Sequence, residues 1–426
     1  MLETIRNAWR VIDIRKKILF TLLIIVVFRV GSVIPVPFID VEALRSSVSD
    51  TGIANQFFSY LSVLTGGGLE YGAIFAMGVQ PYINSSIIVQ LLCVAIPYLE
   101  RLSKEGEEGN KKLAQITRYV TIILGLIQGT AYYVYLNASG FVDAKGGWLW
   151  FAAPVIVLCF TAGSALVMWL GEQIDAKGVG NGISMLLFAG IISRAPQAAN
   201  TLVAYIKMGR YVAVIGIVVV FLAIIGFIVW MTNAERRLPV QYAKRVVGRK
   251  MYGGQNTHIP IKVNMSGVMP IIFASSILML PTMILSFVKN TNSTWYKFLT
   301  LFSVQGVFYA VLYLILIIAF AYFYVTIQYN PVEMANNLRK NSGAIPGIRP
   351  GKPTSDFIQK ILSRITLMGA IFLGILAILP IIIGSVGGIS VSLGGTSILI
   401  LVGVALDTVQ NLESQMMMRH YKGFLD

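Results

Sequence analysis

The sequence predicts an all-α integral membrane protein with ten transmembrane helices, arranged as two inverted five-helix halves. Three observations support this class. Of the 426 residues, 56% are hydrophobic and 12% are charged, and the mean hydropathy of +0.73 lies outside the soluble range. Ten apolar runs approach or exceed the roughly 20 helical residues that cross a bilayer core. A nine-residue motif also recurs at matching places in the two halves.

The predicted spans follow the apolar runs in chain order. We expect them at residues 18–34, 74–97, 119–136, 148–170, 183–205, 212–231, 268–288, 305–327, 365–383 and 397–409. The first run carries Arg29 and ends in IPVP without a small-x-small cleavage site, which predicts a retained helix and not a cleaved signal peptide. Before it, residues 1–17 alternate apolar and basic side chains at helical spacing. This pattern favours an amphipathic helix on the cytoplasmic headgroups, with a simple basic tail as the alternative.

Lysine and arginine are distributed unevenly between the two sides of this topology. The N-terminus, the even-numbered connections and the C-terminal tail carry 26 of them, whereas the other connections carry 6, and Arg29 and Arg194 lie within predicted spans. Because cytoplasmic loops are enriched in these residues, the basic side should be cytoplasmic and hold both termini, including the tail 413–426. Lys207 and Arg210 oppose this asymmetry without reversing it.

The repeated motif is GVQPYINSS at residues 78–86 and GVMPIIFAS at residues 267–275, with Gly, Val, Pro, Ile and Ser at the same offsets. Each copy opens the second helix of a half, 18–206 or 207–412. Because each half has an odd number of spans, the second must enter the membrane from the opposite side. In such inverted repeats, the functional path usually lies between the halves near the midplane.

The polar residues of this motif need partners inside a membrane. We expect Pro81 and Pro270, with Gly78 and Gly267, to let each helix bend. Several polar side chains should then face water or another helix, and not lipid: Asn84, Ser85, Ser86, Gln90, Ser275 and Ser276. Close packing of small residues is the alternative explanation for the serines.

A short apolar segment, residues 55–64, precedes the second span and is too short to cross a membrane. The glycines at 66, 67, 68 and 72 follow it. A short helix on a glycine hinge is typical of a movable re-entrant segment, and a surface loop with one helical turn is the alternative.

The sequence contains no catalytic motif, and we expect no enzyme activity, metal or cofactor. Cys93 and Cys159 lie within predicted spans, where apolar thiols are expected. The segment GVGNG at 178–182 lacks the Lys-Ser/Thr end of a phosphate loop, so we interpret it as a turn with a helix cap near Asn181.

The charged residues of the apolar runs lie near predicted span ends or just outside them: Arg29, Glu70, Arg194 and Asp407. A coupled transporter normally needs charges near the midplane. The interior therefore favours a conduit that seals without binding, through an apolar constriction. A small-solute transporter, recognised by saturable uptake, and an enzyme or scaffold are the alternatives.

Two long basic loops, residues 233–263 and 330–360, indicate a large cytoplasmic partner. Arg349 is bracketed by Pro346, Gly347, Pro350 and Gly351, which predict a stiff turn that presents the guanidinium group. Such a presentation suits bidentate contact with carboxylates or phosphates. Ordinary enrichment of cytoplasmic loops in positive charge is the alternative.

Five motifs, in order along the chain, resemble those of the SecY family of protein-conducting channels: GVQPYINSSIIVQLL, LGEQIDAKGVGNGIS, THIPIKVNMSGVMPIIFASS, IPGIRPG and GGTSILILVGVALD. The resemblance covers nearly the whole chain. It implies a multi-pass protein of the bacterial plasma membrane whose halves surround a central hourglass pore. This pore would pass secretory polypeptides across the membrane and release membrane segments sideways through a lateral gate.

The resemblance also implies roles for particular residues. The apolar pore ring would comprise Ile83, Ile87, Leu187, Ile272 and Ile400, with Leu187 departing from the usual isoleucine. A plug at residues 55–72 would include Phe57, Phe58, Leu61 and Leu64, with the hinge Gly66, Gly67, Gly68 and Gly72. The lateral gate would include Ser86, Gln90, Gln128, Asn264 and Ser275.

The partners implied by the resemblance are the subunits SecE and SecG, the SecA motor ATPase, the ribosome, signal sequences and translocating chains. Contacts with SecA or the ribosome would be made by Lys244, Arg245, Arg249 and Arg349. No specific nucleic-acid function is expected beyond contact with ribosomal RNA. The pore itself would be passive, with energy supplied by SecA or the ribosome.

Overall fold

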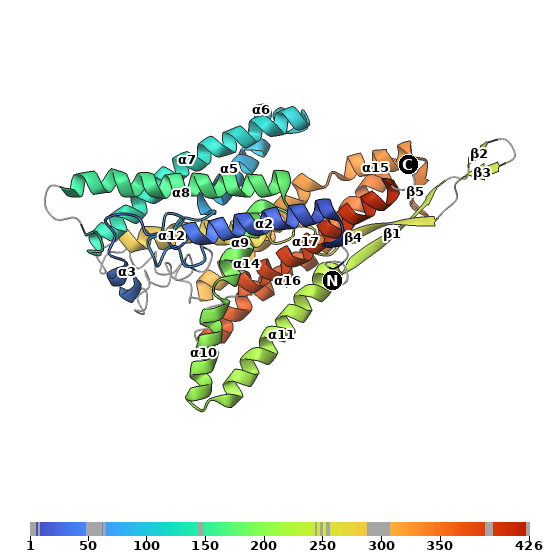
Figure 1. Cartoon of the computed structure of the whole chain (residues 1–426). Helices are drawn as coiled ribbons and strands as arrows, with labels where there is room; N and C mark the ends of the chain where they lie inside the picture. Colours follow the sequence, from blue (N-terminus) through green and yellow to red (C-terminus); the bar gives the residue numbers. More distant parts are fainter. Residues whose placement is uncertain are drawn as a thin grey trace. The chain divides into compact units, whose positions relative to one another are not determined.

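The computed structural model describes residues 6, 9–47, 62, 65–143, 148–242, 245–247, 250–252, 256–287, 307–387 and 395–422. They are mostly helical (Figure 1). They divide between two compact units. The first unit takes the described residues within Met1–Val214, Met279–Val304 and Ser390–Asp426. The second takes those within Ile215–Leu278 and Gln305–Ile389.

The first unit is a helical bundle. Its helices are α2 (Ile12–Gly31), α3 (Val41–Ser47), α5 (Gln80–Ala95), α6 (Pro97–Lys104), α7 (Glu107–Ala138), α8 (Leu149–Lys177), α9 (Gly182–Ile192), α10 (Ala195–Lys207) and α17 (Gly395–Lys422). The long helices α7 and α8 pack along each other (Figure 1), α5 packs on α7, and α9 packs on α2, α8 and α17. A core of buried aliphatic and aromatic side chains, including Tyr132 and Phe160, lies between α7 and α8.

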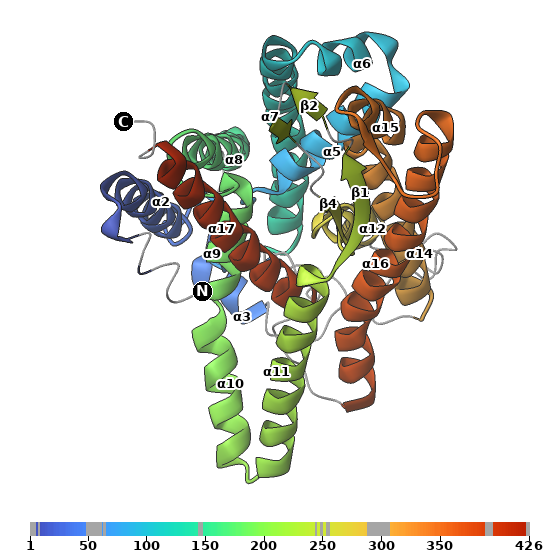
Figure 2. The same ribbon diagram turned by 90° about the vertical axis from the view of Figure 1, so that its right-hand side faces the viewer.

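The second unit combines helices with a small sheet. Its helices are most of α11 (Tyr211–Asn233), the start of α12 (Met269–Phe287), α14 (Val307–Gln328), α15 (Pro331–Lys340) and α16 (Lys352–Gly387). The helices α14 and α16 pack against each other (Figure 2). The strands are β1 (Glu235–Tyr242), β2 (Arg245–Val247), β3 (Lys250–Tyr252), β4 (Asn256–Lys262) and β5 (Gly343–Ala344).

The basic loop 233–263 contains a strand hairpin that the all-α prediction did not include. Strand β1 pairs antiparallel with β4, so that Glu235 faces Lys262, and β5 adds to the other side of β1. Leu238 and Val240 alternate along β1 and are buried in one core with Ile261 and Ile345. This period-two burial explains why the segment forms strands.

Six described helices are long and apolar enough to cross a membrane, or seven if the bent pair α5 and α6 forms one span. They lie at Glu107–Ala138, Trp150–Lys177, Val214–Asn233, Phe308–Lys340, Lys352–Leu379 and Ser397–Met417. Helix α2 has 20 residues but includes Arg15, Lys16, Lys17 and Arg29. The run predicted at 183–205 is broken, because α9 ends at Ile192 and α10 begins at Ala195. The count of ten spans therefore stays a prediction.

The prediction that Pro81 and Pro270 bend their helices is wrong. Pro81 lies in the first turn of α5 and Pro270 is the second residue of α12, where a proline needs no amide hydrogen bond. Gly78 and Gly267, three residues earlier, have φ of +53° and +60°, so both motif copies reach their helix through a left-handed glycine. The bend lies instead between α5 and α6, which diverge by 103° at Ile96 and Pro97.

Candidate functional site

The predicted glycine hinge forms a series of turns in the first unit, from Thr65 to Val79. Gly66 and Gly67 have φ of +65° and +93°, which side chains rarely allow. A Cβ atom on Gly66 would lie 3.0 Å from the Cα of Gly190 and 2.8 Å from the Oγ of Ser193. The hinge therefore lies directly against the C-terminal end of α9.

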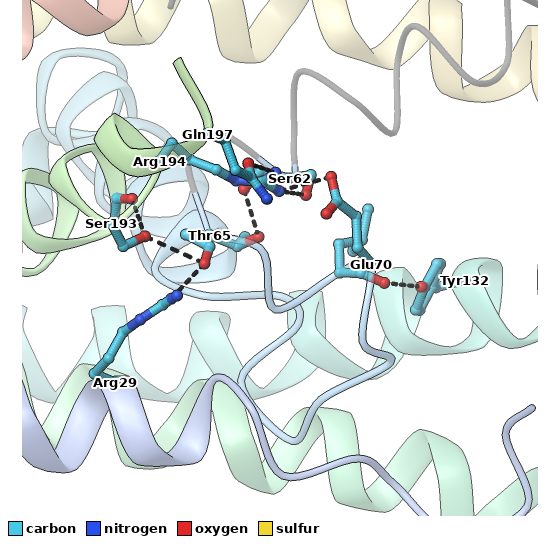
Figure 3. Close-up of polar contacts among 11 residues, drawn as sticks. Arg29, Ser62, Thr65, Glu70, Tyr132, Ser193, Arg194 and Gln197 are labelled. Atoms are coloured by element: carbon cyan, nitrogen blue, oxygen red, sulfur yellow. Dashed lines mark hydrogen bonds and ion pairs between the residues drawn. The ribbon is translucent and has the colours of Figure 1, made fainter. Parts of the chain in front are cut away.

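Two side chains from different helices bind the same hinge carbonyl. Arg29 of α2 donates from Nη1 to the Gly66 carbonyl oxygen, and the hydroxyl of Ser193, the residue after α9, is shared between this oxygen at 3.3 Å and the Gly190 carbonyl oxygen at 2.6 Å. Figure 3 shows both side chains pointing at this backbone group. Because a glycine has no side chain to pack, such contacts to its carbonyl are what fix its position.

A buried ion pair holds the hinge on its other side (Figure 3). Nη2 of Arg194 lies 2.7 Å from Oε1 of Glu70, and their side chains are only 9% and 15% exposed. Arg194 also donates to the hydroxyl of Ser62 and, at 2.6 Å, to Oε1 of Gln197. Its Nε is buried without a hydrogen-bond partner among the described residues. Removing one member of a buried ion pair leaves the other charge uncompensated, at a cost of about 3–5 kcal/mol.

Tyr132 of α7 completes the set by donating to the Leu69 carbonyl oxygen at 3.0 Å. We call these residues the hinge clamp: Arg29, Ser62, Glu70, Tyr132, Ser193 and Arg194. In the sequence, Arg29, Glu70 and Arg194 stand out only as charges near span ends. Charges in apolar segments normally pair with each other or with backbone carbonyls, so their presence was the available signal.

The five residues predicted for the pore ring are all buried, between 2% and 8% exposed. Ile83 and Ile87 lie on α5, Leu187 on α9 and Ile400 on α17, all in the first unit, and α9 packs on α17. Ile272 lies on α12 in the second unit. Convergence of all five therefore stays a prediction.

The polar side chains of α5 partly meet the expectation that they avoid lipid. Ser85 is buried and its Oγ lies 2.6 Å from Oγ1 of Thr121 on α7, so it joins two helices. Gln90 is half-buried and donates to Ser86 on its own helix at 3.3 Å.

The predicted gate residues are divided between the two units. Gln128 of α7 is half-buried in the first unit with Ser86 and Gln90. Asn264 and Ser275 belong to the second unit, where Oδ1 of Asn264 is buried without a partner among the described residues and Ser275 donates to the Ile272 carbonyl oxygen. The gate stays a prediction.

Several predicted site residues fall outside the described residues. They are Phe57, Phe58, Leu61 and Leu64 of the plug, and Lys244 and Arg249 of the first basic loop. Arg245 lies in β2. Among the described residues, no group of three or more His, Cys, Asp or Glu side chains is placed to hold a metal ion.

Arg349 is exposed on a turn in the second basic loop. Its carbonyl oxygen accepts a hydrogen bond of 2.8 Å from the Thr354 hydroxyl, and Ile348 N donates to Ile345 O at 3.1 Å. Ile345 is buried in the core beside β1. These contacts anchor the turn on both sides of Arg349, as its proline and glycine neighbours predict.

Several helices that are long and apolar enough to cross a membrane define a polytopic membrane protein. The sequence profile of the SecY family matches residues 73–409. The protein translocase subunits SecY of Mycobacterium tuberculosis and Bacillus subtilis are 43% and 45% identical to this chain, and each alignment covers the whole of both chains. The chain belongs to the SecY family.

Solved structures share the fold. One described as a protein conducting channel gives a TM-score of 0.65 over 94% of this chain and 92% of that chain, at 17% identity. A SecY structure whose plug domain is described as stabilising the closed state gives 0.64 at 16% identity, over the same shares. Sec61 in the canine ribosome-channel complex from the endoplasmic reticulum gives 0.60 at 15% identity, also over these shares.

Proposed function

We propose that this chain is the pore-forming subunit of a protein translocation channel in the bacterial plasma membrane. It passes unfolded secretory polypeptides across the membrane and releases membrane segments sideways through a lateral gate. The observation that carries this proposal is the full-length relation to protein translocase subunits at 43% and 45% identity. The chain acts as a passive conduit and catalyses no covalent step.

The seal of this conduit is the ring of Ile83, Ile87, Leu187, Ile272 and Ile400. Branched aliphatic side chains form no directional bonds, so they can close on each other or around an extended polypeptide at modest cost. Their burial supports a role in an apolar constriction. Hydrated ions are excluded because the ring offers nothing to replace their water.

Around this ring, residues 55–72 form the plug, and the two halves, 18–206 and 207–412, part at the lateral gate. Ser86, Gln90 and Gln128 line one side of the gate, and Asn264 and Ser275 line the other. The half-buried amides of Gln90 and Gln128 support this assignment, because a polar side chain in a membrane protein needs water or a partner.

The basic loops face the cytoplasm, as do both termini, and they bind the machinery that supplies energy. The exposed, anchored turn at Arg349 presents a cation to SecA or the ribosome, and Lys244, Arg245 and Arg249 of the first basic loop contribute to the same contact. SecE and SecG complete the complex. The 26-to-6 asymmetry of Lys and Arg supports this orientation.

Reconstitution tests this function. Vesicles containing the chain with its SecE and SecG subunits and SecA should import an unfolded secretory polypeptide in an ATP-dependent way, without saturable uptake of small solutes. Arg349→Glu should abolish motor-driven import while the chain still inserts and assembles, whereas Lys352→Glu, at an exposed neighbour, should retain it. Absence of import by the parent chain would refute the function, and normal import by Arg349→Glu would refute the role of this arginine.

A further inference from the structure

The hinge segment is anchored differently at its two ends. Downstream, Leu69 is buried in the apolar core with Met77 and Tyr132. Upstream, Gly66 and Gly67 carry no side chains, and the side-chain groups near them are polar: Arg29 of α2, and Ser193 and Arg194 after α9. Apolar packing therefore helps to fix the downstream end, while polar contacts of the hinge clamp hold both the glycines and Glu70.

The ion pair of the hinge clamp involves a residue that lies between two helices. Arg194 lies between α9 and α10, where its backbone nitrogen donates to Ile191 O and its carbonyl accepts from the nitrogens of Gln197 and Ala198. Its side chain crosses to Glu70 and Ser62, 124 and 132 residues away in sequence. Any change of angle at this break must move the guanidinium group relative to the hinge.

Helix α9, which ends two residues before Arg194, carries a predicted ring residue. Leu187 lies on α9, seven residues before Arg194, which follows the C-terminal end of this helix. Gly190, one turn after Leu187, contacts Gly66 directly. The C-terminal end of α9 therefore contacts the hinge, and Leu187 on the same helix belongs to the predicted constriction.

We infer that the Arg194–Glu70 ion pair is a latch that holds the glycine hinge on the end of α9 and keeps the resting channel closed. Arg194 and Glu70 are positioning residues, which act on the pore through the hinge and through α9. This inference rests on the proposed function, since a latch matters only if the chain forms a pore. Because the pair is desolvated, its strength depends on complete geometry, and loss of either charge releases the hinge.

The test measures resting ion permeability of reconstituted vesicles without motor or substrate. Glu70→Gln and Arg194→Gln should each raise this permeability by about tenfold, because each shifts the equilibrium between the closed and the open channel about tenfold toward the open state. The double variant should leak no more than the single ones, because both remove the same interaction. The matched control is Glu100→Gln, which removes the exposed i,i+4 pair with Lys104 in the same unit.

A second readout separates the latch from general destabilisation. The ratio of import of a polypeptide with an interrupted signal sequence to import of one with an intact signal should rise about fivefold in both variants. A purely structural defect lowers both imports and leaves this ratio unchanged. Arg194→Lys with intact Glu70 should restore most of the low permeability, because it keeps a cation at this place.

The outcomes distinguish the latch from the proposed function. Permeability and import ratio equal to those of the parent chain in Glu70→Gln would overturn the latch, and this variant alone decides if Arg194→Gln fails to accumulate. Failure of the parent chain to import any secretory polypeptide would instead overturn the proposed function.

Discussion

At the residue scale, helix α5 shows how burial separates neighbouring apolar positions. Ile83 and Ile87 are one turn apart and both buried, whereas Val94 further along the helix is 58% exposed. All three look alike in hydropathy. The family resemblance singled out Ile83 and Ile87, and composition alone could not have done so.

Replacing Ile83 with asparagine should open the ring to ions. A buried amide attracts water into an apolar constriction, so we expect ion leak to rise roughly tenfold, the effect of about 1.4 kcal/mol. Vesicle conductance measures this, with Val94→Asn as the exposed control on the same helix. Equal leak in both variants would remove Ile83 from the ring.

The pairing of the hinge-clamp residues could not be predicted from the sequence. Arg194 and Glu70 are 124 residues apart, and their pairing depends on how the chain folds back between α2, α7 and α9. The sequence did indicate that charges in apolar segments need partners. It could not say which partners, since no periodic pattern connects residues so far apart.

At the element scale, the predicted helix bends were wrong. The motif copies lie at the starts of α5 and α12, where their prolines begin the helices and do not bend them. A proline is tolerated in the first turn and disruptive further inside, so its effect depends on a helix boundary known only to within a few residues. The hairpin of β1 and β4 was missed, although alternating Leu238 and Val240 carried the signal.

The GVGNG turn provides an element-scale prediction. A Cβ atom on Gly182 would lie 1.9 Å from the carbonyl oxygen of Gly171 on α8, so Gly182→Ala must separate α8 from α9. We expect a loss of roughly 1–3 kcal/mol of stability, seen as a lower thermal midpoint of the purified complex. Gly216→Ala in α11, where a Cβ meets nothing within 4 Å, should not lower it. Equal midpoints would contradict the close packing of these helices.

At the scale of the whole molecule, composition predicted the membrane class, and the motifs predicted the family to which the chain belongs. The arrangement of the halves did not follow from either. Helix α17 clusters with the first compact unit, although it comes last in the chain. Such an association depends on side-chain packing between distant helices, which a hydropathy pattern does not encode.

The proposed function requires a translocating polypeptide to pass along the ring residues, Ile83 and Ile272 among them. Cysteines placed at Ile83 and at Ile272, after replacement of Cys93 and Cys159 by alanine, test this most directly. A secretory chain stalled during import should crosslink to both positions, and not to a cysteine at Val219, which is exposed on α11. Crosslinking at Ile83 and Ile272 no stronger than at Val219 would contradict the claim.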